Sequence, residues 1–265
     1  MDLGIKGRCA LVCGASKGLG LACATALARE GVHVLLVARG ADALAAAAAT
    51  LAQDPRLPVG TCVQNFAADI GTEAGRAAVL AVRNEIAILV NNGGGPPPGD
   101  FRAWERDDWV RALDANMLAP IALMRAAIDG MVARGFGRIV NITSSAVKAP
   151  IEMLGLSNGA RSGLTGFVGG LARSTELAGA NVTVNNLLPG LFDTERMAQL
   201  AHAAAGRAGQ SVARYTQDKH ATIPARRAGR PEEFGAACAF LCSAQAGYLT
   251  GQNILLDGGA FRGTL

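Results

Sequence analysis

The sequence predicts an α/β protein with a doubly wound parallel sheet, built as a single domain over residues 1–265. Its length suits one large α/β domain. Half of the residues are hydrophobic and 17% are charged, so the chain can bury a sizeable core. Short, continuously apolar runs alternate with segments of helical length. Such runs are typical of parallel strands, which are buried on both faces.

The apolar runs are the expected strands of this sheet, and with their neighbours we expect about seven strands in all. No linker or low-complexity stretch divides them, which favours one domain with right-handed crossovers. The runs are Cys9–Cys13, Val32–Ala38, Ile86–Val90, Ile139–Ile142, Val182–Leu188 and Ile254–Leu256.

Helices are expected between the strands. Leu19–Glu30 and Ala41–Ala52 are rich in alanine, a strong helix former. Apolar residues recur at helical spacing within Asn116–Arg134 and Ser157–Ala178. The longest insertion, Leu191–Ile223, is polar and alanine-rich and is expected to hold two short helices.

Composition argues against several classes of partner. The formal net charge of +4 is spread along the chain and aromatic residues make up 5%, so we expect no nucleic-acid groove. No run reaches the roughly 18 apolar residues of a membrane helix, and the first apolar run is too short for a signal peptide. These observations predict a soluble cytoplasmic protein without a membrane partner.

The six cysteines lie in apolar segments, which favours small, reduced core residues. Cys238 and Cys242 have the i, i+4 spacing of one helix face, but a metal site needs further ligands and the chain has only three histidines. We therefore expect no metal.

A glycine-rich loop follows the first expected strand and opens a helix. Glycines there let the backbone approach a pyrophosphate, whose charge sits at the positive end of the helix. The alternative is a turn that merely packs helix on strand. The candidate contacts are Gly14, Ser16, Lys17, Gly18, Leu19 and Gly20.

Further motifs occur in a fixed order along the chain and extend this pattern from about Arg8 to Gly259. They are Asn91-Asn92-Gly93-Gly94, Asn116, Ser144, Pro189-Gly190, Arg230-Pro231-Glu232-Glu233, Leu249-Thr250-Gly251-Gln252 and Asp257-Gly258-Gly259. Together they resemble the short-chain dehydrogenase/reductase (SDR) superfamily, and within it the 3-oxoacyl-carrier-protein reductases. The resemblance implies a Rossmann-type fold and a homotetramer or dimer built on the helices 116–134 and 157–178. It also implies cofactor contacts at Asp69, Asn92, Gly93, Pro189 and Gly190.

The second strand indicates which nicotinamide cofactor is preferred. NAD sites place an acid at its end, whereas NADP sites need cations for the 2′-phosphate. Here the strand ends at Arg39, which with Lys17 can flank that phosphate, so we expect NADP(H). Arg39 as a solvated charge and Asp69 as the cap of a helix beginning near Thr72 are the alternatives.

The expected catalytic pattern is incomplete. Ser144 and Asn116 match the serine and asparagine of the superfamily, but Ser157 and Arg161 stand where the resemblance places a tyrosine and a lysine. A serine hydroxyl does not ionise near neutral pH, and a guanidinium lacks the tunable pKa of an ammonium. Residues 157, 161, 164 and 168 share one helical stripe, which predicts that both substitutions face inward.

An inward arginine must be paired. We expect Arg161 to contact the cofactor ribose, a carbonyl near Asn141–Thr143, a substrate carboxylate or Glu152. Lys148 is a candidate proton donor, with a solvated loop charge as its alternative. Tyr248 is expected to pack structurally and Tyr215 to lie exposed in the insertion.

The favoured function is an NADP-dependent oxidoreductase that transfers hydride between nicotinamide and a small carbonyl or alcohol substrate. Ser144 would orient the carbonyl oxygen, Asn116 would relay protons and Arg161 would supply positive charge, while the proton donor is unassigned. Two alternatives are a cofactor-binding protein without redox turnover and a lyase or isomerase on the same fold. Pocket walls are expected from residues 93–99, 147–156 and 191–223.

Overall fold

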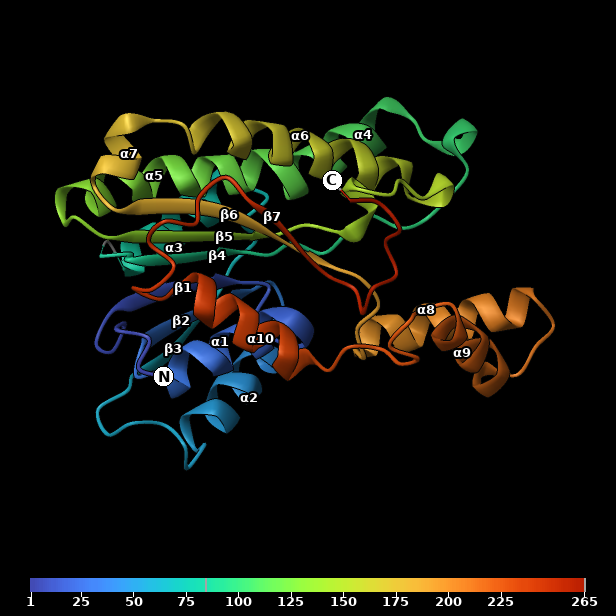
Figure 1. The fold of residues 1–265 in the computed structure, drawn as a ribbon, viewed down its shortest axis with the longest axis horizontal. Helices are drawn as coiled ribbons and strands as arrows, with labels where there is room; N and C mark the ends of the chain where they lie inside the picture. Colours follow the sequence, from blue (N-terminus) through green and yellow to red (C-terminus); the bar gives the residue numbers. More distant parts are fainter. Residues whose placement is uncertain (84, 265) are drawn as a thin grey trace.

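The computed structural model describes residues 1–83 and 85–264 and contains a seven-stranded parallel sheet between two layers of helices (Figure 1). The strand order is β3-β2-β1-β4-β5-β6-β7, as expected for a doubly wound sheet. The strands are β1 (Cys9–Cys13), β2 (His33–Ala38), β3 (Val63–Ala67), β4 (Ile88–Asn91), β5 (Gly137–Ile142), β6 (Val182–Pro189) and β7 (Asn253–Leu256).

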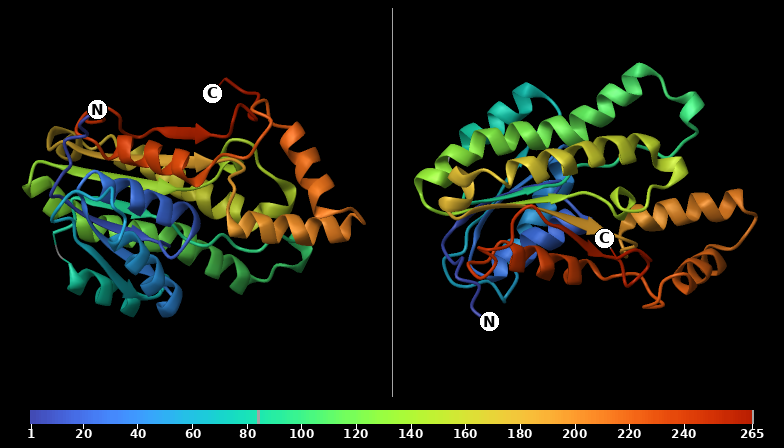
Figure 2. Two further views of the ribbon diagram at one scale, coloured as in Figure 1. Left: turned by 90° about the horizontal axis from the view of Figure 1, so that it is seen from below. Right: turned by 45° about the horizontal axis from the view of Figure 1, so that its top comes forward.

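Helices α1, α2 and α10 cover one face of the sheet, and α3 to α7 lie on the other, while α8 and α9 project beyond the sheet (Figures 1 and 2). The bounds are α1 Gly18–Arg29, α2 Ala41–Ala52, α3 Glu73–Val82, α4 Arg106–Leu113, α5 Ala119–Ala133, α6 Gly155–Leu171, α7 Thr175–Gly179, α8 Glu195–Arg207, α9 Val212–Ala221 and α10 Pro231–Leu241.

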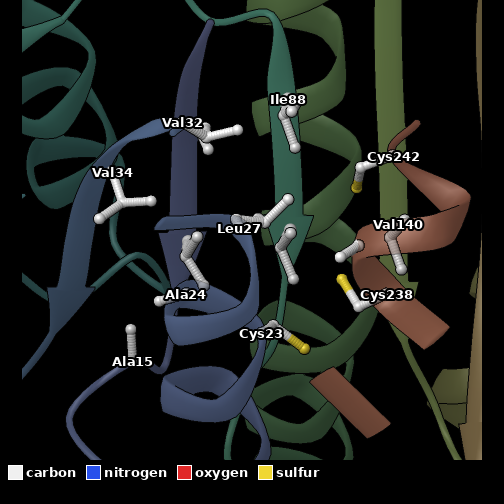
Figure 3. Close-up of a cluster of buried hydrophobic side chains, with 14 of the residues drawn as sticks. Ala15, Cys23, Ala24, Leu27, Val32, Val34, Ile88, Val140, Cys238 and Cys242 are labelled. Atoms are coloured by element: carbon white, nitrogen blue, oxygen red, sulfur yellow. The ribbon is translucent and has the colours of Figure 1, made fainter. Parts of the chain in front are cut away.

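The core under α1 and α10 contains three buried cysteines, Cys23, Cys238 and Cys242, among apolar side chains such as Leu27 (Figure 3). The pKa of the Cys238 and Cys242 thiols is raised, chiefly by their hydrogen bonds to neighbouring thiols and also by burial. These cysteines are therefore neutral packing residues. The expectation that all six cysteines lie in the core is wrong for Cys62, which is exposed because it precedes the half-exposed edge strand β3.

The second core lies between the sheet and α3, α5, α6 and α7. The helical run Arg106–Ala133 is long enough and, in part, apolar enough to cross a membrane by length and composition alone. Its apolar residues Leu123, Met124 and Met131 are instead buried in this core. The fold thus uses the run as a packing helix.

The structure corrects two expected elements. β3 is not among the apolar runs because Gln64 and Asn65 interrupt VQNFA, as suits a half-exposed edge strand. The expected helix 157–178 is broken, since α6 ends at Leu171 and Ser174 caps a separate α7. The two helices expected in the insertion are present as α8 and α9.

Close packing of α1 against α10 depends on Gly235. A Cβ on Gly235 would stand 2.4 Å from the carbonyl oxygen of Ala22. Gly235→Ala is therefore expected to lower the free energy of unfolding by about 1–3 kcal/mol, measured by urea denaturation. Gly206→Ala is the matched control, because a Cβ there has no neighbour within 4 Å and helix propensity favours alanine. Equal effects of the two changes would refute this packing role.

Candidate functional site

The glycine loop between β1 and α1 is a tight turn. Gly14 and Gly18 have φ of +61° and +60°, a region that side chains rarely adopt. A Cβ on Gly20 would lie 2.2 Å from the carbonyl oxygen of Gly14. No side chain caps the start of α1, and its first turn carries no acid. The loop therefore presents free backbone N–H groups at a positive helix end, which suits a phosphate.

The loop after β4 meets the glycine loop at the point where the strand order reverses. Asn92 Nδ2 donates to the Gly14 carbonyl oxygen at 3.2 Å. A Cβ on Gly14 would lie 2.6 Å from Asn92 Nδ2, so glycine is required for this approach. A Cβ on Gly93 would lie 3.0 Å from the carbonyl oxygen of Ala115. This crevice is where doubly wound folds bind nucleotides.

Arg39 and Lys17 flank the same end of the sheet. Arg39 directly follows β2, is exposed and forms no salt bridge within the described residues. Lys17 Nζ lies 2.9 Å from Glu195 Oε2, and both side chains are about 60% exposed. Such a surface pair contributes little, so both cations remain available to an anionic ligand.

Asp69, Pro189 and Gly190 lie at strand ends on the same edge of the sheet. Asp69 Oδ1 accepts from Gly71 N at 2.9 Å. The alternative of Asp69 as a helix cap is wrong, because the side chain of Thr72 caps α3. Pro189 ends β6, and Gly190 lies so close to Asp257 that a Cβ would stand 2.6 Å from its Cβ.

Asn116 is held in an irregular turn. Residues Asp114–Leu118 form a π-helical turn between α4 and α5, a feature frequent at functional sites. Asn116 Nδ2 donates to the Ala112 carbonyl oxygen, while its buried Oδ1 has no partner within the described residues. That oxygen lies 3.8 Å from the Cβ position of Gly93. An acceptor is thus left free beside the β4 loop.

Ser144 follows β5 and begins a short 3₁₀ turn. Its Oγ accepts from Ala146 N at 3.1 Å, leaving its own proton free to be donated. Lys148, half-buried on the same loop, has its Nζ 5.7 Å from the ring centre of Phe261. The observed partner of this lysine is therefore an aromatic ring of the C-terminal segment.

Arg161 is anchored where β4 and β5 end. Ser157, Arg161, Leu164 and Val168 are all buried, which confirms the predicted inward stripe of α6. Arg161 Nη1 donates to the carbonyl oxygens of Ile142 and Thr143 at 2.7 and 2.8 Å, and Nη2 donates to Gly93 at 3.3 Å. Carbonyls at this strand end were one of the expected partners.

Arg161 has no acidic partner within the described residues, and Glu152 is exposed. The expectation that Glu152 pairs with Arg161 is therefore wrong, because the Glu152 side chain lies on the outer surface of the loop before α6. Burial, and then the positive charge of Arg196, lower the pKa of Arg161 to about 10. The guanidinium still carries its charge at neutral pH.

Three loops expected as pocket walls are joined by hydrogen bonds. Gly99 N donates to the Met153 carbonyl oxygen at 2.9 Å. Arg196 Nη2, from α8, donates to the Gly95 carbonyl oxygen at 3.0 Å. The loops after β4, β5 and β6 therefore surround the end of the sheet at which Arg161 lies.

The two tyrosines lie away from these contacts. Tyr215 is half-buried on α9 rather than exposed as expected, with Lys219 Nζ 5.6 Å from its ring centre. Tyr248 is fully exposed, so the expectation that it packs structurally is wrong. The turn buries Ala246 and leaves Tyr248 in solvent.

A hollow of about 690 Å³ lies between α1 and α10 and reaches Gly18 and Thr194. Ser144, Ser157 and Arg161 do not line it. This hollow borders only the outer side of the glycine loop. We therefore locate the candidate site from the strand ends and the side chains that lie there.

A row of four asparagines, which sequence reasoning missed, runs across β4 to β7 beside the site. Asn91, Asn141, Asn186 and Asn253 are in register on β4 to β7. Each amide nitrogen donates to the next side-chain oxygen, at 2.8, 3.2 and 2.8 Å. The signal was an asparagine within or directly beside each of these four expected strands. The row links the side chains of four neighbouring strands, three of which carry the loops after β4, β5 and β6.

One end of the sheet thus carries the glycine loop, the exposed cations Lys17 and Arg39, the half-buried hydroxyl of Ser144, the buried amide of Asn116 and the buried guanidinium of Arg161. Residues 14–260 match the family model described as Enoyl-(Acyl carrier protein) reductase. The chain belongs to the short-chain dehydrogenase/reductase family.

Particular relatives span nearly the whole chain. Dehydrogenase/reductase SDR family member 4 of Bos taurus is 33% identical over 97% of this chain and 88% of its own length. The 3-oxoacyl-[acyl-carrier-protein] reductase FabG of Vibrio cholerae is 31% identical over 98% and 99%. The structure of L-sorbose reductase from Gluconobacter frateurii, complexed with NADPH and L-sorbose, has a TM-score of 0.91, 33% identity and coverage of 99% and 100%.

Proposed function

We propose that this protein is an NADP(H)-dependent oxidoreductase that interconverts a small carbonyl compound and the corresponding alcohol. The observation that carries the proposal is the glycine loop, closed on Asn92 and flanked by Arg39. Its relatives include a 3-oxoacyl-carrier-protein reductase and a sorbose reductase bound to NADPH. A single domain over residues 1–265 is the unit we propose to bind the cofactor.

The residues present fit a dinucleotide phosphate. The N–H groups around Ser16, Gly18 and Leu19 suit the pyrophosphate, while Arg39 and Lys17 suit a 2′-phosphate. Gly14, Gly20, Asp69, Gly93, Pro189 and Gly190 form the remaining proposed contacts. When bound, NADPH supplies the hydride for the substrate carbonyl carbon.

The protein groups act on the substrate oxygen. The Ser144 hydroxyl donates a hydrogen bond to the carbonyl oxygen and keeps its proton, and Arg161 stabilises the negative charge that develops on that oxygen when the carbonyl carbon is reduced. A proton must then reach that oxygen to complete the alcohol. Asn116 Oδ1, buried and unpartnered, fits an acceptor that orients a water in the relay.

Ser157 and Arg161 make this active site atypical for the family pattern, which places tyrosine and lysine there. Arg161 is locked by three carbonyl oxygens, so we assign it charge stabilisation rather than proton transfer. Ser157 contributes a buried hydroxyl one helical turn earlier. Lys148 is a weaker candidate acid, because its observed contact is with Phe261.

An absorbance assay tests the proposal. Purified protein is incubated with NADPH and a panel of ketoses, short oxo acids, oxo esters and 3-oxoacyl thioesters, and alcohols are assayed with NADP⁺ in reverse. We expect substrate-dependent loss of NADPH in at least one class. NADPH binding with no turnover in either direction would favour a cofactor-binding protein instead.

We also propose a homo-oligomer built on α5 and α6. A Cβ on Gly163 would clash with Met117, but at Gly166, Gly169 and Gly170 it would have no neighbour within 4 Å. The large side chain of Phe167 is 38% exposed on the same helix. An open glycine row beside an exposed aromatic ring suits close approach of a second helix.

Light scattering at micromolar concentration is expected to give the mass of a dimer or tetramer. Gly166→Arg or Gly170→Arg should reduce that mass by crowding the row, whereas Gly179→Arg on α7, equally open, should not. A monomer in the unaltered protein would refute the oligomer.

A further inference from the structure

Two arginines from different helices converge on the loop after β4. Arg161 of α6 and Arg196 of α8 each direct a guanidinium nitrogen toward Gly95. A Cβ at Gly95 would lie 3.1 Å from Arg196 Nη2 and 3.6 Å from Arg161 Nη2. The two nitrogens are therefore no more than about 7 Å apart.

Neither guanidinium is neutralised by an acid in the part of the chain that the structure describes. Their observed partners are main-chain carbonyl oxygens. Glu195, the residue before Arg196, pairs with Lys17 instead. Two like charges this close, one of them buried, are unfavourable without a counter-charge. The pair of guanidinium groups therefore suits an anionic ligand.

Gly95 has no side chain to stand between the two guanidinium groups, and a Cβ there would be in tight contact with Arg196. A carboxylate has two oxygens, each able to accept a charge-assisted bond of about 2.7–2.9 Å. It can therefore bridge one nitrogen of Arg161 and one of Arg196. Arg161 also bonds to the carbonyl of Thr143, the residue before Ser144, so a bridging anion would lie near the proposed carbonyl site.

We propose that Arg161 and Arg196 bind a carboxylate of the substrate, which makes the substrate a short oxo acid or the corresponding hydroxy acid. This inference rests on the proposed function, since it names the substrate class of the same site. Arg196 is a specificity residue in this account. Its charge selects the anion, while its bond to Gly95 holds the loop.

The first test compares acids with their uncharged esters. Dissociation constants are measured by calorimetry on NADPH-saturated protein for 2-oxopentanoate, 4-oxopentanoate and 5-oxohexanoate and for their methyl esters. We expect at least one acid to bind about tenfold or more tighter than its ester. If every acid binds no more tightly than its ester, the carboxylate site is overturned.

The second test removes the charge of Arg196 but keeps a donor for the Gly95 carbonyl. Arg196→Gln should weaken the preferred acid about tenfold, leave its ester unchanged and leave NADPH affinity unchanged. Arg207→Gln, which removes the same charge from the far end of α8, should change none of these. Equal weakening of acid and ester by Arg196→Gln would show that Arg196 only holds the loop, and would overturn the inference.

The same samples separate this inference from the proposed function. If acid-selective binding depends on Arg196 but no hydride transfer occurs, the proposed oxidoreductase function is refuted and the proposed anion site is supported. If ketones and esters are turned over without any preference for acids, the proposed anion site is refuted and the proposed oxidoreductase function is supported.

Discussion

Arg161→Ala is expected to lower kcat/KM for the carbonyl substrate by about 10²–10³-fold, the usual effect of removing one group that stabilises a developing oxyanion. The structure gives the reason, because Arg161 is buried at the ends of β4 and β5 with three carbonyl oxygens holding its orientation. If the nicotinamide ribose is also a partner, NADPH affinity should fall by about 1.5–3 kcal/mol.

Steady-state kinetics and NADPH titration measure these effects. The melting temperature measures the stability lost when three carbonyl oxygens no longer accept hydrogen bonds from Arg161. Arg173→Ala is the control, since that arginine follows the same helix but is exposed and unpaired within the described residues. Unchanged affinity, turnover and melting temperature in Arg161→Ala would together show that the residue has no role.

Restoring the family pattern discriminates further. If the site is active as it stands, the double change Ser157→Tyr and Arg161→Lys should perturb an existing activity. New reductase activity toward simple ketones, where the unaltered protein has none, would instead indicate a fold that has lost catalysis.

Arg39→Asp is expected to reverse cofactor preference. The change removes a cation at the end of β2 and places a carboxylate where it repels a 2′-phosphate and accepts from a 2′-hydroxyl. Loss of one charge-assisted interaction, about 1.5–3 kcal/mol, corresponds to a rise of roughly 10- to 150-fold in the Kd for NADPH. The Kd for NADH should fall.

Fluorescence titration of both cofactors gives these constants. Arg173→Asp makes the same charge change at a distant exposed site and should leave both constants unaltered. Lys17→Ala should have the smaller effect, because Lys17 already shares its charge with Glu195. Tighter binding of NADH than NADPH to the unaltered protein would contradict the assignment.

The fold was largely predictable because its strands are buried on both faces and so stand out as apolar runs. The predicted bounds of β1 agree with the structure to the residue. In the structure β5 begins two residues and β7 one residue before the predicted start, because the first residues of these strands are polar or small. β3 escaped because an edge strand need not be apolar throughout. The break between α6 and α7 escaped because apolar spacing continues past Leu171, while Ser174 begins a new helix.

The candidate site could be predicted where its residues belong to one short stretch of sequence. The inward position of Arg161 followed from helical spacing, and its contact with the β5 carbonyls was among the partners foreseen. The approach of Arg196 to Gly95 joins residues 101 positions apart, so no local pattern signals it. The asparagine row and the free Oδ1 of Asn116 likewise depend on strand register and on a π turn.

Transfer of deuterium from NADPH labelled at C4 tests the central claim most directly. Both C4 diastereomers are supplied separately with the panel of oxo acids, esters, ketoses and thioesters, and products are analysed by mass spectrometry. The account predicts an alcohol that carries one deuterium on the former carbonyl carbon, from one diastereomer only, and formation of that product about 10²–10³-fold more slowly in Arg161→Ala. Saturating NADPH binding with no labelled product from any member of the panel would contradict it.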